Sequence, residues 1–435
     1  MNELIIDYRH KKGRIKPLHG VGNGPLSRGN TIDTSKYFKM ISPPFARLHD
    51  TGFPESREVD VHTIFRDFSK DADNPENYDF FLTDKYLKAI LDLGTDIIYR
   101  LGETIATADR RIYVNPPEDN EKYARICVNI IRHYNDGWAD GHNYGINYWE
   151  IWNEPSVDNM WTGNTKEWLE LYGAVFKAIK DYDSELMIGG PVACEPNSII
   201  HYPFLDYVTE KKLIPDFYSF HCYTSSMEHA KYYLDSMYEK LEEYNLTQLP
   251  AFITEWNYVP RGDDGRVFWE IPRSEKLDLF HRMVSAEGAA HTAMFLGLLQ
   301  DSFVEEANYY AMHVDGLFSC FSKYGVPEKP FFSLVAFKHI YDLGNQIVVN
   351  GNETLSESYC VASGNEGRCR ILISNLKNDD SHFKIKIQGF DYSKASLRII
   401  DDVSDLDSGC LNESDPGIFE LQVPLGTVVL IEVSR

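Results

Sequence analysis

Short apolar runs alternate with helical patterns from about Ile15 to Gly344. Eight of these runs are nearly continuous in apolar residues and have the length of strands: residues 16–22, 44–50, 96–103, 147–155, 186–193, 216–224, 250–257 and 292–300. Strands of this composition are typical of a parallel sheet whose outer face is covered by helices. Eight strand–helix units in one region favour an α/β fold of the (β/α)8 type, a TIM barrel, over an open doubly wound sheet.

Two of the intervening segments show clear helical periodicity. Residues 83–94 place their apolar side chains on one face, and the segment ends at Gly94, a residue typical of helix C-caps. Residues 165–182 space their apolar side chains at i, i+3, i+4 and i+7, as an amphipathic helix does. Both segments therefore predict helices packed against the sheet.

The pattern changes after residue 344. Strand-like runs separated by turns follow one another with no helical pattern between them, which predicts an all-β sandwich over residues 345–435. An isolated apolar run, "ELIIDY" at 3–8, precedes the barrel. We expect three segments: an N-terminal strand (1–14) that joins the sandwich, a catalytic barrel (15–344) and the accessory sandwich (345–435).

The net negative charge disfavours some classes of binding partner. The chain carries 66 acidic and 43 basic residues, a formal net charge of −23. Such a chain repels nucleic acid and anionic membranes, because phosphate binding depends on clustered Lys and Arg. A neutral small molecule is the partner that the charge favours.

The compartment stays open at this stage. The chain contains no run of about 20 apolar residues, so no membrane-spanning helix is expected. The first 20 residues lack the apolar core of a secretory signal. The chain as it stands indicates a cytoplasmic protein, and removal of a signal would make it periplasmic or secreted.

Seven cysteines are scattered along the chain without any CxxC pair, which disfavours cysteine-based zinc or redox motifs. Cys360 and Cys369 are symmetric about Gly364 and Asn365, a candidate two-residue hairpin turn. They could face each other across this hairpin, and a disulfide between them would need an oxidising compartment. Whether they are bonded stays open.

Reactive side chains of such barrels lie at the C-terminal ends of the strands. The ends of the predicted strands carry the following polar and aromatic residues: His49, Asp50, Glu103, Asn153, Glu154, His221, Tyr223, Glu255, Trp256, Gln300 and Asp301. Glu154 and Glu255 end strands four and seven, which lie three apart around the ring. Their carboxylates can therefore converge across the pocket.

Two converging carboxylates are what glycosidic bond cleavage requires. One protonates the leaving oxygen, and the other attacks or supports the oxocarbenium-like centre. Asn153 is placed to hydrogen-bond a sugar hydroxyl beside that centre. Carboxylates at strand ends are common, however, so the residues alone leave both the pairing and the roles open.

The neighbouring residues have their own interpretations. Glu150 lies in mid-strand and is expected to point outward or to pair locally, while Trp149 and Trp152 are expected to pack. Trp256 is a candidate sugar platform, and Tyr223 a candidate hydrogen-bond donor that holds Glu255 ionised. The glycines of "HGVGNGPL" (19–26) lack the spacing of a nucleotide-binding loop, which disfavours a nucleotide site.

Two stretches carry a family resemblance. "WEIWNEP" (149–155) and "FITEWN" (252–257) are similar to the large clan of retaining glycosidases on (β/α)8 barrels, which has an Asn-Glu dipeptide on strand four and a Glu on strand seven. Within this clan the chain most resembles glycoside hydrolase family 39, the β-xylosidases and α-L-iduronidases. "ARLHD" (46–50), "NYDFFLTDKYLKAILDLG" (77–94) and the trailing sandwich fit that family.

The resemblance implies roles that the residues alone could not order. It makes Glu154 the acid/base and Glu255 the nucleophile, and it places Asn153 on a sugar hydroxyl. His49, His221 and Tyr223 would be pocket residues. The family also implies retention through a glycosyl-enzyme intermediate, carboxyl groups about 5–5.5 Å apart, and no metal or cofactor.

The substrate stays open, because two strand ends depart from the family pattern. Strand three ends in "YRLGET" (99–104), and "MFLGLLQDS" (294–302) lacks the tryptophan-rich character of xylosidases. We expect an exo-acting retaining glycosidase of a neutral sugar, such as a β-D-xyloside. Alternatives are an arabinoside, galactoside, glucoside or uronide, or a non-catalytic carbohydrate-binding protein. A uronate would need a basic subsite, for which Arg47, Arg100 and Arg261 are candidates. A homo-oligomer is compatible with the sequence.

Overall fold

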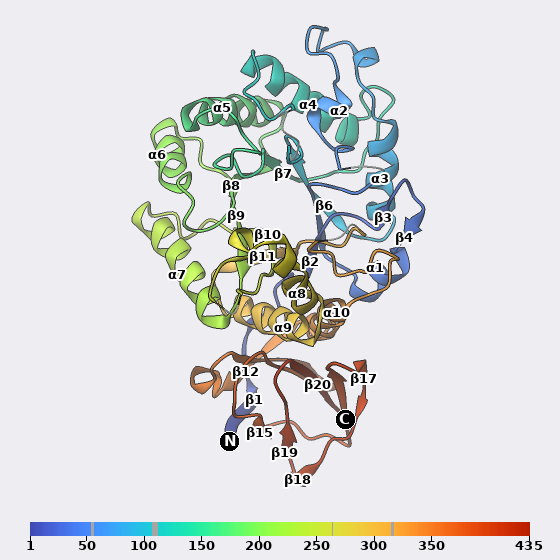
Figure 1. Ribbon diagram of the computed structural model, residues 1–435, viewed down its shortest axis with the longest axis vertical. Helices are drawn as coiled ribbons and strands as arrows, with labels where there is room; N and C mark the ends of the chain where they lie inside the picture. The colour runs from blue at the N-terminus through green and yellow to red at the C-terminus, as the bar shows by residue number, and fades with distance from the viewer. Residues whose placement is uncertain (54–55, 107–111, 263, 315–316) are drawn as a thin grey trace.

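The computed structural model describes residues 1–435 except 54–55, 107–111, 263 and 315–316. It places a closed barrel above a large β-sheet (Figure 1). The barrel consists of eight parallel strands in the ring order β10, β11, β2, β5, β6, β7, β8, β9. Their bounds are β2 (Gly20–Gly22), β5 (Phe45–Leu48), β6 (Asp96–Leu101), β7 (Tyr148–Ile151), β8 (Met187–Ala193), β9 (Phe217–Thr224), β10 (Ala251–Tyr258) and β11 (Val304–Tyr309). The predicted (β/α)8 barrel is confirmed.

Helices form the outer layer of the barrel. They are α1 (Ser35–Ile41), α2 (Val61–Ile64), α3 (Phe81–Leu91), α4 (Asn120–Asp136), α5 (Thr165–Tyr182), α6 (His201–Lys211), α7 (Met227–Glu243), α8 (Arg273–Val284), α9 (Ala286–Gln300) and α10 (Lys329–Tyr341). Short elements join them: β3 (Leu26–Ser27), β4 (Ile32–Asp33), η1 (Pro75–Asn77) and η2 (Phe268–Glu270). The two helices predicted from periodicity are α3 and α5. The capping residue of α5 is Asn164, whose side chain and that of Glu167 form a capping box.

The prediction of an eighth strand at residues 292–300 is wrong. Residues 292–300 belong to helix α9, and β11 closes the barrel instead. The helix is buried along nearly its whole length, because it lies between β10 of the barrel and β13, β14 and β20 of the sheet. A helix without a solvent-exposed face lacks polar residues at helical spacing, so its sequence resembles that of a buried strand. Gln300 and Asp301 consequently lie at the junction with the sheet, where both bond to Gln346.

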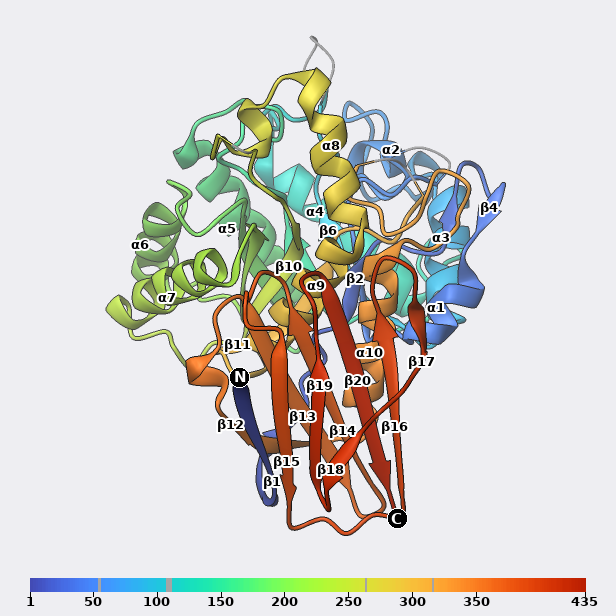
Figure 2. The same ribbon diagram turned by 60° about the horizontal axis from the view of Figure 1, so that its bottom comes forward.

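The second sheet is a single curled layer of ten strands in the order β17, β16, β20, β14, β13, β12, β1, β15, β19, β18. Its strands are β1 (Asn2–Arg14), β12 (Asn345–Asn350), β13 (Ser358–Asn365), β14 (Arg368–Asn375), β15 (His382–Gln388), β16 (Lys394–Ile400), β17 (Asp405–Gly409), β18 (Glu413–Asp415), β19 (Ile418–Gln422) and β20 (Thr427–Ser434), with η3 (Asn352–Thr354) between β12 and β13. The N-terminal strand β1 pairs antiparallel with β12 and parallel with β15 (Figure 2).

Both faces of this sheet are buried near its centre. On β14, Leu372 joins the core shared with the barrel, while Ile371 and Ile373 enter a separate core that the curled sheet encloses. Successive side chains of a strand point to opposite faces, so one strand can serve both cores. The sheet is therefore fastened to the barrel through α9 and α10.

Cys360 and Cys369 are not bonded to each other: both are free and buried. Asn365 pairs with Arg368, so the hairpin turns at residues 366–367, two residues later than the symmetric arrangement requires. The Asn365 side chain fixes this turn by accepting hydrogen bonds from the backbone of Gly367 and Arg368, both at 3.1 Å. Cys369 then lies opposite Gly364, and Cys360 lies opposite Ile373.

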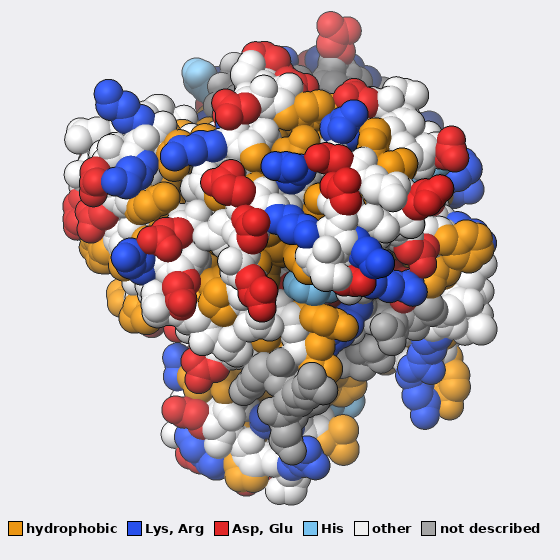
Figure 3. Space-filling view, turned by 90° about the horizontal axis from the view of Figure 1, so that it is seen from above, with side chains coloured by type: hydrophobic (Ala, Val, Ile, Leu, Met, Phe, Trp, Pro, Cys, Tyr) orange, Lys and Arg blue, Asp and Glu red, His pale blue; other side chains and the backbone are white. Residues whose placement is uncertain are grey.

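The surface carries mixed charge. Seen from above, acidic and basic side chains are interspersed with hydrophobic ones over the upper face (Figure 3). Among the residues that the structure describes, no helix has the length and apolar character needed to cross a membrane.

Candidate active site

The carboxylates of Glu154 and Glu255 converge at the mouth of the barrel. One oxygen of each, together with Nδ1 of His221, lies within 4.8 Å of the other two atoms. Nδ1 of His221 is 2.7 Å from Oε1 of Glu154 and 3.5 Å from Oε2 of Glu255. The structure thus brings together three residues that the sequence placed at the ends of three different strands.

A sharp change of chain direction after β7 presents Glu154. Trp152 and Glu154 both adopt the left-handed region, with φ of 72° and 43°. Residues other than glycine occupy this region at a cost, and such positions cluster at functional sites. The backbone N–H of Glu154 donates to the carbonyl of Val192 at 2.9 Å, which fixes the turn against β8.

Glu255 is held by two hydrogen-bond donors, Tyr223 on the neighbouring strand β9 and Arg47 on β5, which lies three strands away around the barrel. Nη1 of Arg47 donates to its Oε1 at 2.5 Å, and the hydroxyl of Tyr223 donates to its Oε2 at 2.7 Å. The predicted hydrogen bond from Tyr223 is confirmed. Both oxygens of the Glu255 carboxylate are thus fixed in position.

Arg47 connects the site to the barrel interior. Its side chain is fully buried, and its guanidinium also donates to Oε2 of Glu150 at 2.7 Å and to Oδ1 of Asn153 at 2.6 Å. A buried guanidinium is tolerated when it is paired and hydrogen-bonded, and here each of its three nitrogens donates one hydrogen bond. Arg47 is therefore not free to bind a substrate carboxylate.

Glu150 points into the barrel and not outward; of the two alternatives expected for it, outward or paired, the structure shows the pairing, with Arg47. Trp149 takes the outward direction and packs in the core between sheet and helices. Because successive side chains of a strand alternate, Glu150 must then face inward, where Arg47 neutralises it. Trp152 is buried as well, so the packing predicted for both tryptophans is confirmed.

Asn153 and His49 form the next layer of the site. Oδ1 of Asn153 accepts from Arg47, so its amide Nδ2 faces Nε2 of His49 at 3.2 Å. Burial, reinforced by the positive charges of Arg100 and Arg47, holds the pKa of His49 well below its usual value. The imidazole is therefore neutral at neutral pH.

Asp50 lies beside His49, with Oδ1 3.3 Å from the imidazole Nε2. Burial and the nearby charge of Glu255 raise the pKa of Asp50 to about 7. Its backbone also adopts a left-handed φ of 49°. Asp50 therefore adds a second titratable carboxyl to the site.

Burial sets the protonation states of Glu154 and His221. It raises the pKa of Glu154 to about 7, although the positive charge of Arg47 opposes this shift. Burial lowers the pKa of His221 to about 4, so that this imidazole is neutral at neutral pH. The two converging carboxyls thus differ in their surroundings: one tends to keep its proton, and the other receives two donors.

Trp256 does not reach the mouth, contrary to the expectation of a sugar platform. Its indole is fully buried, with ring centroids 4.8 Å from Phe295 of α9 and 5.1 Å from Tyr309 of β11. Glu255 points inward, so the next residue on the strand points to the helices. Trp256 is a packing residue.

Glu103 also lies outside the convergent cluster. It is buried, and its Oε1 lies 2.5 Å from Nδ1 of His62. Burial raises its pKa to about 7. Of the other two basic candidates, Arg100 is buried and bonds to Asp60, while Arg261 donates to the carbonyl of Gly265.

Three aromatic residues near the mouth could not be found from the sequence. Phe318 lies 5.5 Å from Tyr223 and 6.0 Å from Trp269, measured between ring centroids. Trp269 belongs to η2 and is 61% exposed. Tyr310 follows β11 and lies 6.2 Å from Phe318. Phe318 lies in the segment after β11, and Trp269 lies in the segment after β10. Neither segment has a strand pattern, so no sequence signal places these residues at the mouth.

The charges disfavour a cation between Glu154, His221 and Glu255, although their ligand atoms have the spacing of a metal site. The Arg47 guanidinium already supplies positive charge at 2.5 Å from Glu255. A second cation would face this charge in a buried site. The arrangement therefore suits proton transfer and nucleophilic attack by the carboxylates.

Comparison with known sequences places the chain among glycoside hydrolases. The model of glycosyl hydrolases family 39 matches residues 24–261, a range that contains Glu154 and Glu255. A beta-xylosidase of Geobacillus stearothermophilus is 28% identical over 226 residues, which cover 45% of this chain and 44% of that protein. A beta-xylosidase of Caldicellulosiruptor saccharolyticus is 25% identical over 347 residues, covering 72% and 68%. The alignment with the Geobacillus stearothermophilus beta-xylosidase thus spans less than half of that protein's length.

Two solved structures share the fold over the full chain. A glucosidase from Croceicoccus marinus superposes with a TM-score of 0.83 at 18% identity, covering 100% of this chain and 99% of that one. A family 39 beta-xylosidase from Caulobacter crescentus superposes with a TM-score of 0.74 at 17% identity, covering 100% of both. At these identities the likeness concerns the fold alone.

Proposed function

Because the chain belongs to glycosyl hydrolase family 39 and is thus a glycoside hydrolase, we propose that it releases a terminal β-D-xylosyl residue with retention of configuration. The observation that carries this proposal is the pair of converging carboxyls in unequal surroundings. Glu154 has a pKa raised to about 7, and Glu255 accepts hydrogen bonds from Arg47 and Tyr223. The pair therefore supplies one acid and one nucleophile.

In the first step Glu255 attacks the anomeric carbon. An ester bond forms between its carboxylate oxygen and the sugar while the bond to the leaving oxygen breaks. Glu154 gives its proton to that leaving oxygen, so the departing group leaves as a neutral alcohol. The raised pKa suits this role, because an acid must hold its proton at the working pH.

In the second step Glu154 acts as a base. Now ionised, it takes a proton from a water molecule, whose oxygen attacks the anomeric carbon and displaces Glu255 from the ester. The cycle ends with Glu154 protonated and Glu255 ionised. His221 lies between the two carboxyls and, being neutral, can hydrogen-bond either without adding charge.

The separation of the carboxyls supports retention over inversion. One oxygen of Glu154 and one of Glu255 lie within 4.8 Å of each other. Retaining enzymes hold their carboxyl groups about 5–5.5 Å apart, whereas inverting enzymes leave about 6.5–9.5 Å for a water molecule. The shorter gap favours direct attack by Glu255.

The surroundings favour a neutral sugar. Arg47 and Arg100 are fully buried and engaged by acidic partners, so neither offers a charge to a uronate carboxylate. The exposed Trp269 and the nearby Phe318 suit the apolar face of a sugar or aglycone. Two relatives bear the name beta-xylosidase, which directs the proposal to a xyloside.

A panel of aryl glycosides tests the sugar and the stereochemistry together. We expect the aryl β-D-xyloside to be cleaved fastest among the xyloside, glucoside, galactoside, arabinoside and uronide. Proton NMR of the first-formed sugar should show the β-anomer, which later mutarotates. If the α-anomer forms first, retention is wrong. If no glycoside is cleaved while free sugars still bind, the chain is a carbohydrate-binding protein.

Azide rescue tests the two roles with an internal control. Glu255→Ala should lose about 10⁴-fold or more in kcat, and azide should restore turnover by forming the α-xylosyl azide. Glu154→Ala should instead form the β-xylosyl azide, because Glu255 still builds the intermediate. If Glu255→Ala gave the β-azide and Glu154→Ala the α-azide, Glu154 would be the nucleophile and Glu255 the acid/base.

A further inference from the structure

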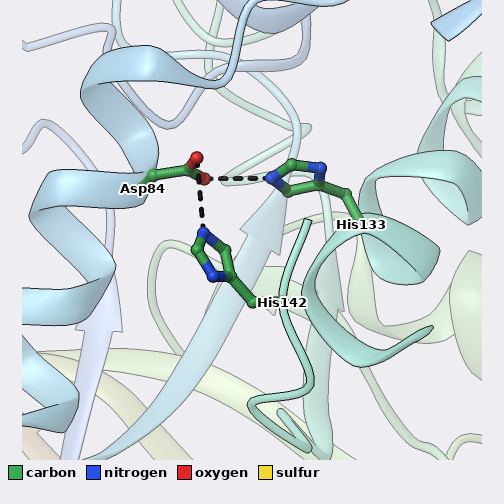
Figure 4. Close-up of side chains that lie close together, drawn as sticks. All are labelled: Asp84, His133 and His142. Atoms are coloured by element: carbon green, nitrogen blue, oxygen red, sulfur yellow. Dashed lines mark hydrogen bonds and ion pairs between the residues drawn. The ribbon is translucent and has the colours of Figure 1, made fainter. Parts of the chain in front are cut away.

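Asp84, His133 and His142 converge in the helical layer outside the barrel (Figure 4). Asp84 lies in the first turn of α3, His133 in the last turn of α4, and His142 in the loop that follows α4. Oδ1 of Asp84 is 3.0 Å from Nε2 of His133, and Oδ2 is 3.4 Å from Nε2 of His142. Each carboxylate oxygen thus faces one imidazole.

The hydrogen bond on the far side of His133 fixes its tautomer. Nδ1 of His133 lies 2.9 Å from the carbonyl oxygen of Trp138, which can only accept, so Nδ1 carries a proton. Nε2 is then the ring nitrogen that faces a carboxylate oxygen of Asp84 at 3.0 Å, and either a proton or a metal cation between the two atoms accounts for this contact. An imidazole held by a backbone carbonyl on its other nitrogen is typical of metal ligands.

His142 adds a second nitrogen that lacks a hydrogen bond. Its Nε2 is buried and makes no aligned hydrogen bond among the described residues, and its one contact is the 3.4 Å ion pair with Oδ2 of Asp84. Both rings are held by stacking: His133 lies 3.5 Å from Phe80, and His142 lies 4.4 Å from Tyr144, measured between ring centroids. The ring nitrogens are therefore positioned before any ligand arrives.

The backbone between the two histidines is closed tightly. The N–H of His142 donates to the carbonyl of His133 at 2.6 Å, and the N–H of Gly137 donates to the carbonyl of His142 at 2.8 Å. A Cβ at Gly141 would lie 2.1 Å from the His133 carbonyl oxygen and 2.7 Å from its Nδ1. Only glycine allows this approach, so the loop is built to set one histidine beside the other.

We propose that Asp84, His133 and His142 bind a divalent transition-metal ion, with Zn²⁺ as the best fit. Zinc takes imidazole and carboxylate ligands at about 2.0–2.2 Å, which places neighbouring ligand atoms of a tetrahedron roughly 3.3 Å apart. The nitrogen–oxygen separations, 3.0 Å from His133 to Oδ1 and 3.4 Å from His142 to Oδ2 of Asp84, are close to this spacing. With one carboxylate oxygen and two imidazole nitrogens as ligands, a tetrahedral ion keeps one position for a further ligand.

The ion would act as a structural clamp. It joins the start of α3 to the end of α4 and to the loop behind α4, and none of the three ligands hydrogen-bonds to Glu154, Glu255 or His221 in the described chain. The site is independent of the proposed function. The expectation of no metal rested on cysteine spacing and on the family resemblance, and neither addressed this cluster.

Metal titration of the full chain tests the site. Chelator-treated protein is titrated with ZnCl₂ by calorimetry, and with CoCl₂ by the visible absorption band of tetrahedral Co²⁺. We expect one ion per chain and a rise in Tm on Zn²⁺ addition. His142→Ala and Asp84→Asn should weaken binding by about 100-fold or more and abolish the Tm rise. His382→Ala is the matched control, because His382 is exposed on β15.

A second variant separates the two clusters with metal-ligand spacing. Glu255→Gln changes the active-site cluster and should leave Zn²⁺ binding unchanged. The proposal is overturned if wild-type protein binds no Zn²⁺ at micromolar concentrations, if His142→Ala binds as tightly as wild type, or if only Glu255→Gln loses the ion. His142→Gln is measured as well, so that a folding defect of the alanine variant does not decide the result.

Discussion

Nη1 of Arg47 donates to Oε1 of Glu255 at 2.5 Å, from a side chain that is fully buried. The same guanidinium pairs with Glu150 and with the amide oxygen of Asn153. Glu150 therefore affects Glu255 indirectly, because it fixes the plane of the guanidinium that holds Glu255. A fully buried ion pair in the barrel interior thus orients a carboxylate at its mouth.

Arg47→Lys should lower kcat by about 10²–10³-fold with a smaller change in KM. Lysine keeps the charge but cannot donate along three fixed directions in one plane, and each lost hydrogen bond to a charged group is worth about 1.5–3 kcal/mol. Steady-state kinetics on an aryl xyloside measure the effect. Arg100→Lys is the matched control, since Arg100 is equally buried but pairs with Asp60. Equal losses in both variants would argue for a general packing defect.

Activity should fall as the pH rises through about 7. Glu154, with a pKa of about 7, is protonated below this pH and ionised above it, and the first step needs the proton. This basic limb of the pH profile, the fall in activity above about pH 7, should disappear in Glu154→Gln when the assay uses a dinitrophenyl glycoside and azide. The dinitrophenyl group leaves without an acid, and azide attacks without a base. Asp50 also has a pKa of about 7, so Asp50→Asn is the control. Loss of the limb in Asp50→Asn alone would assign it to Asp50.

Glu154→Gln should stabilise the fold at pH 8 but not at pH 4. The pKa of Glu154 is raised from 4.5 to about 7, so between these values the unfolded chain releases a proton that the folded chain keeps. The free energy of unfolding of wild type therefore falls as pH rises across this window, by at most about 3 kcal/mol. Urea unfolding at several pH values measures the difference.

Glu287 provides the control of opposite sign. Although burial opposes it, hydrogen bonds from Arg282 and Tyr258 lower the pKa of Glu287 to about 2. Its contribution to stability is present above about pH 4.5 and is lost as pH falls toward 2. Glu287→Gln should therefore destabilise the fold at neutral pH. A Glu154→Gln variant that behaves in the same way would refute the raised pKa.

Tyr223→Phe should lower kcat/KM by about 10–100-fold, because the hydrogen bond it donates to Glu255 at 2.7 Å has a charged acceptor. The phenyl ring keeps its contact with Phe318, so the fold should be unchanged. Tyr258→Phe is the matched control, since it removes a hydrogen bond to Glu287. Full activity of Tyr223→Phe would mean that Arg47 alone orients Glu255.

Trp256→Phe should lower stability by about 1–2 kcal/mol without changing KM. The indole fills space between β10, β11 and α9, and the smaller ring leaves a cavity there. Trp269→Ala should do the reverse: it should raise KM for aryl xylosides several-fold and leave the Tm unchanged, because Trp269 is 61% exposed. Thermal melts and kinetics on both variants distinguish packing from substrate contact. A raised KM in Trp256→Phe would restore it as a sugar platform.

The sequence alone located most of the barrel and the two glutamates. Seven of its eight strands followed from local apolar runs, and the Asn153-Glu154 and Glu255 positions followed from the ends of two of them. These signals are local, because a strand buried on both faces is apolar along its length. The same rule failed at α9, since a helix enclosed by barrel and sheet is also apolar on all sides.

Only the tertiary structure decided which way side chains point and what they meet. Arg47 meets Glu150 and Glu255 across 103 and 208 residues of chain, and Asp84 meets His133 across 49. No local pattern encodes such contacts, because they depend on strand order and on the two-residue alternation that sent Glu150 inward and Trp256 outward. The raised pKa of Glu154 follows for the same reason: burial is a property of the assembled barrel. The sequence thus determined which strand ends carry the two glutamates, and the folded structure determined the contacts and burial on which the proposed roles rest.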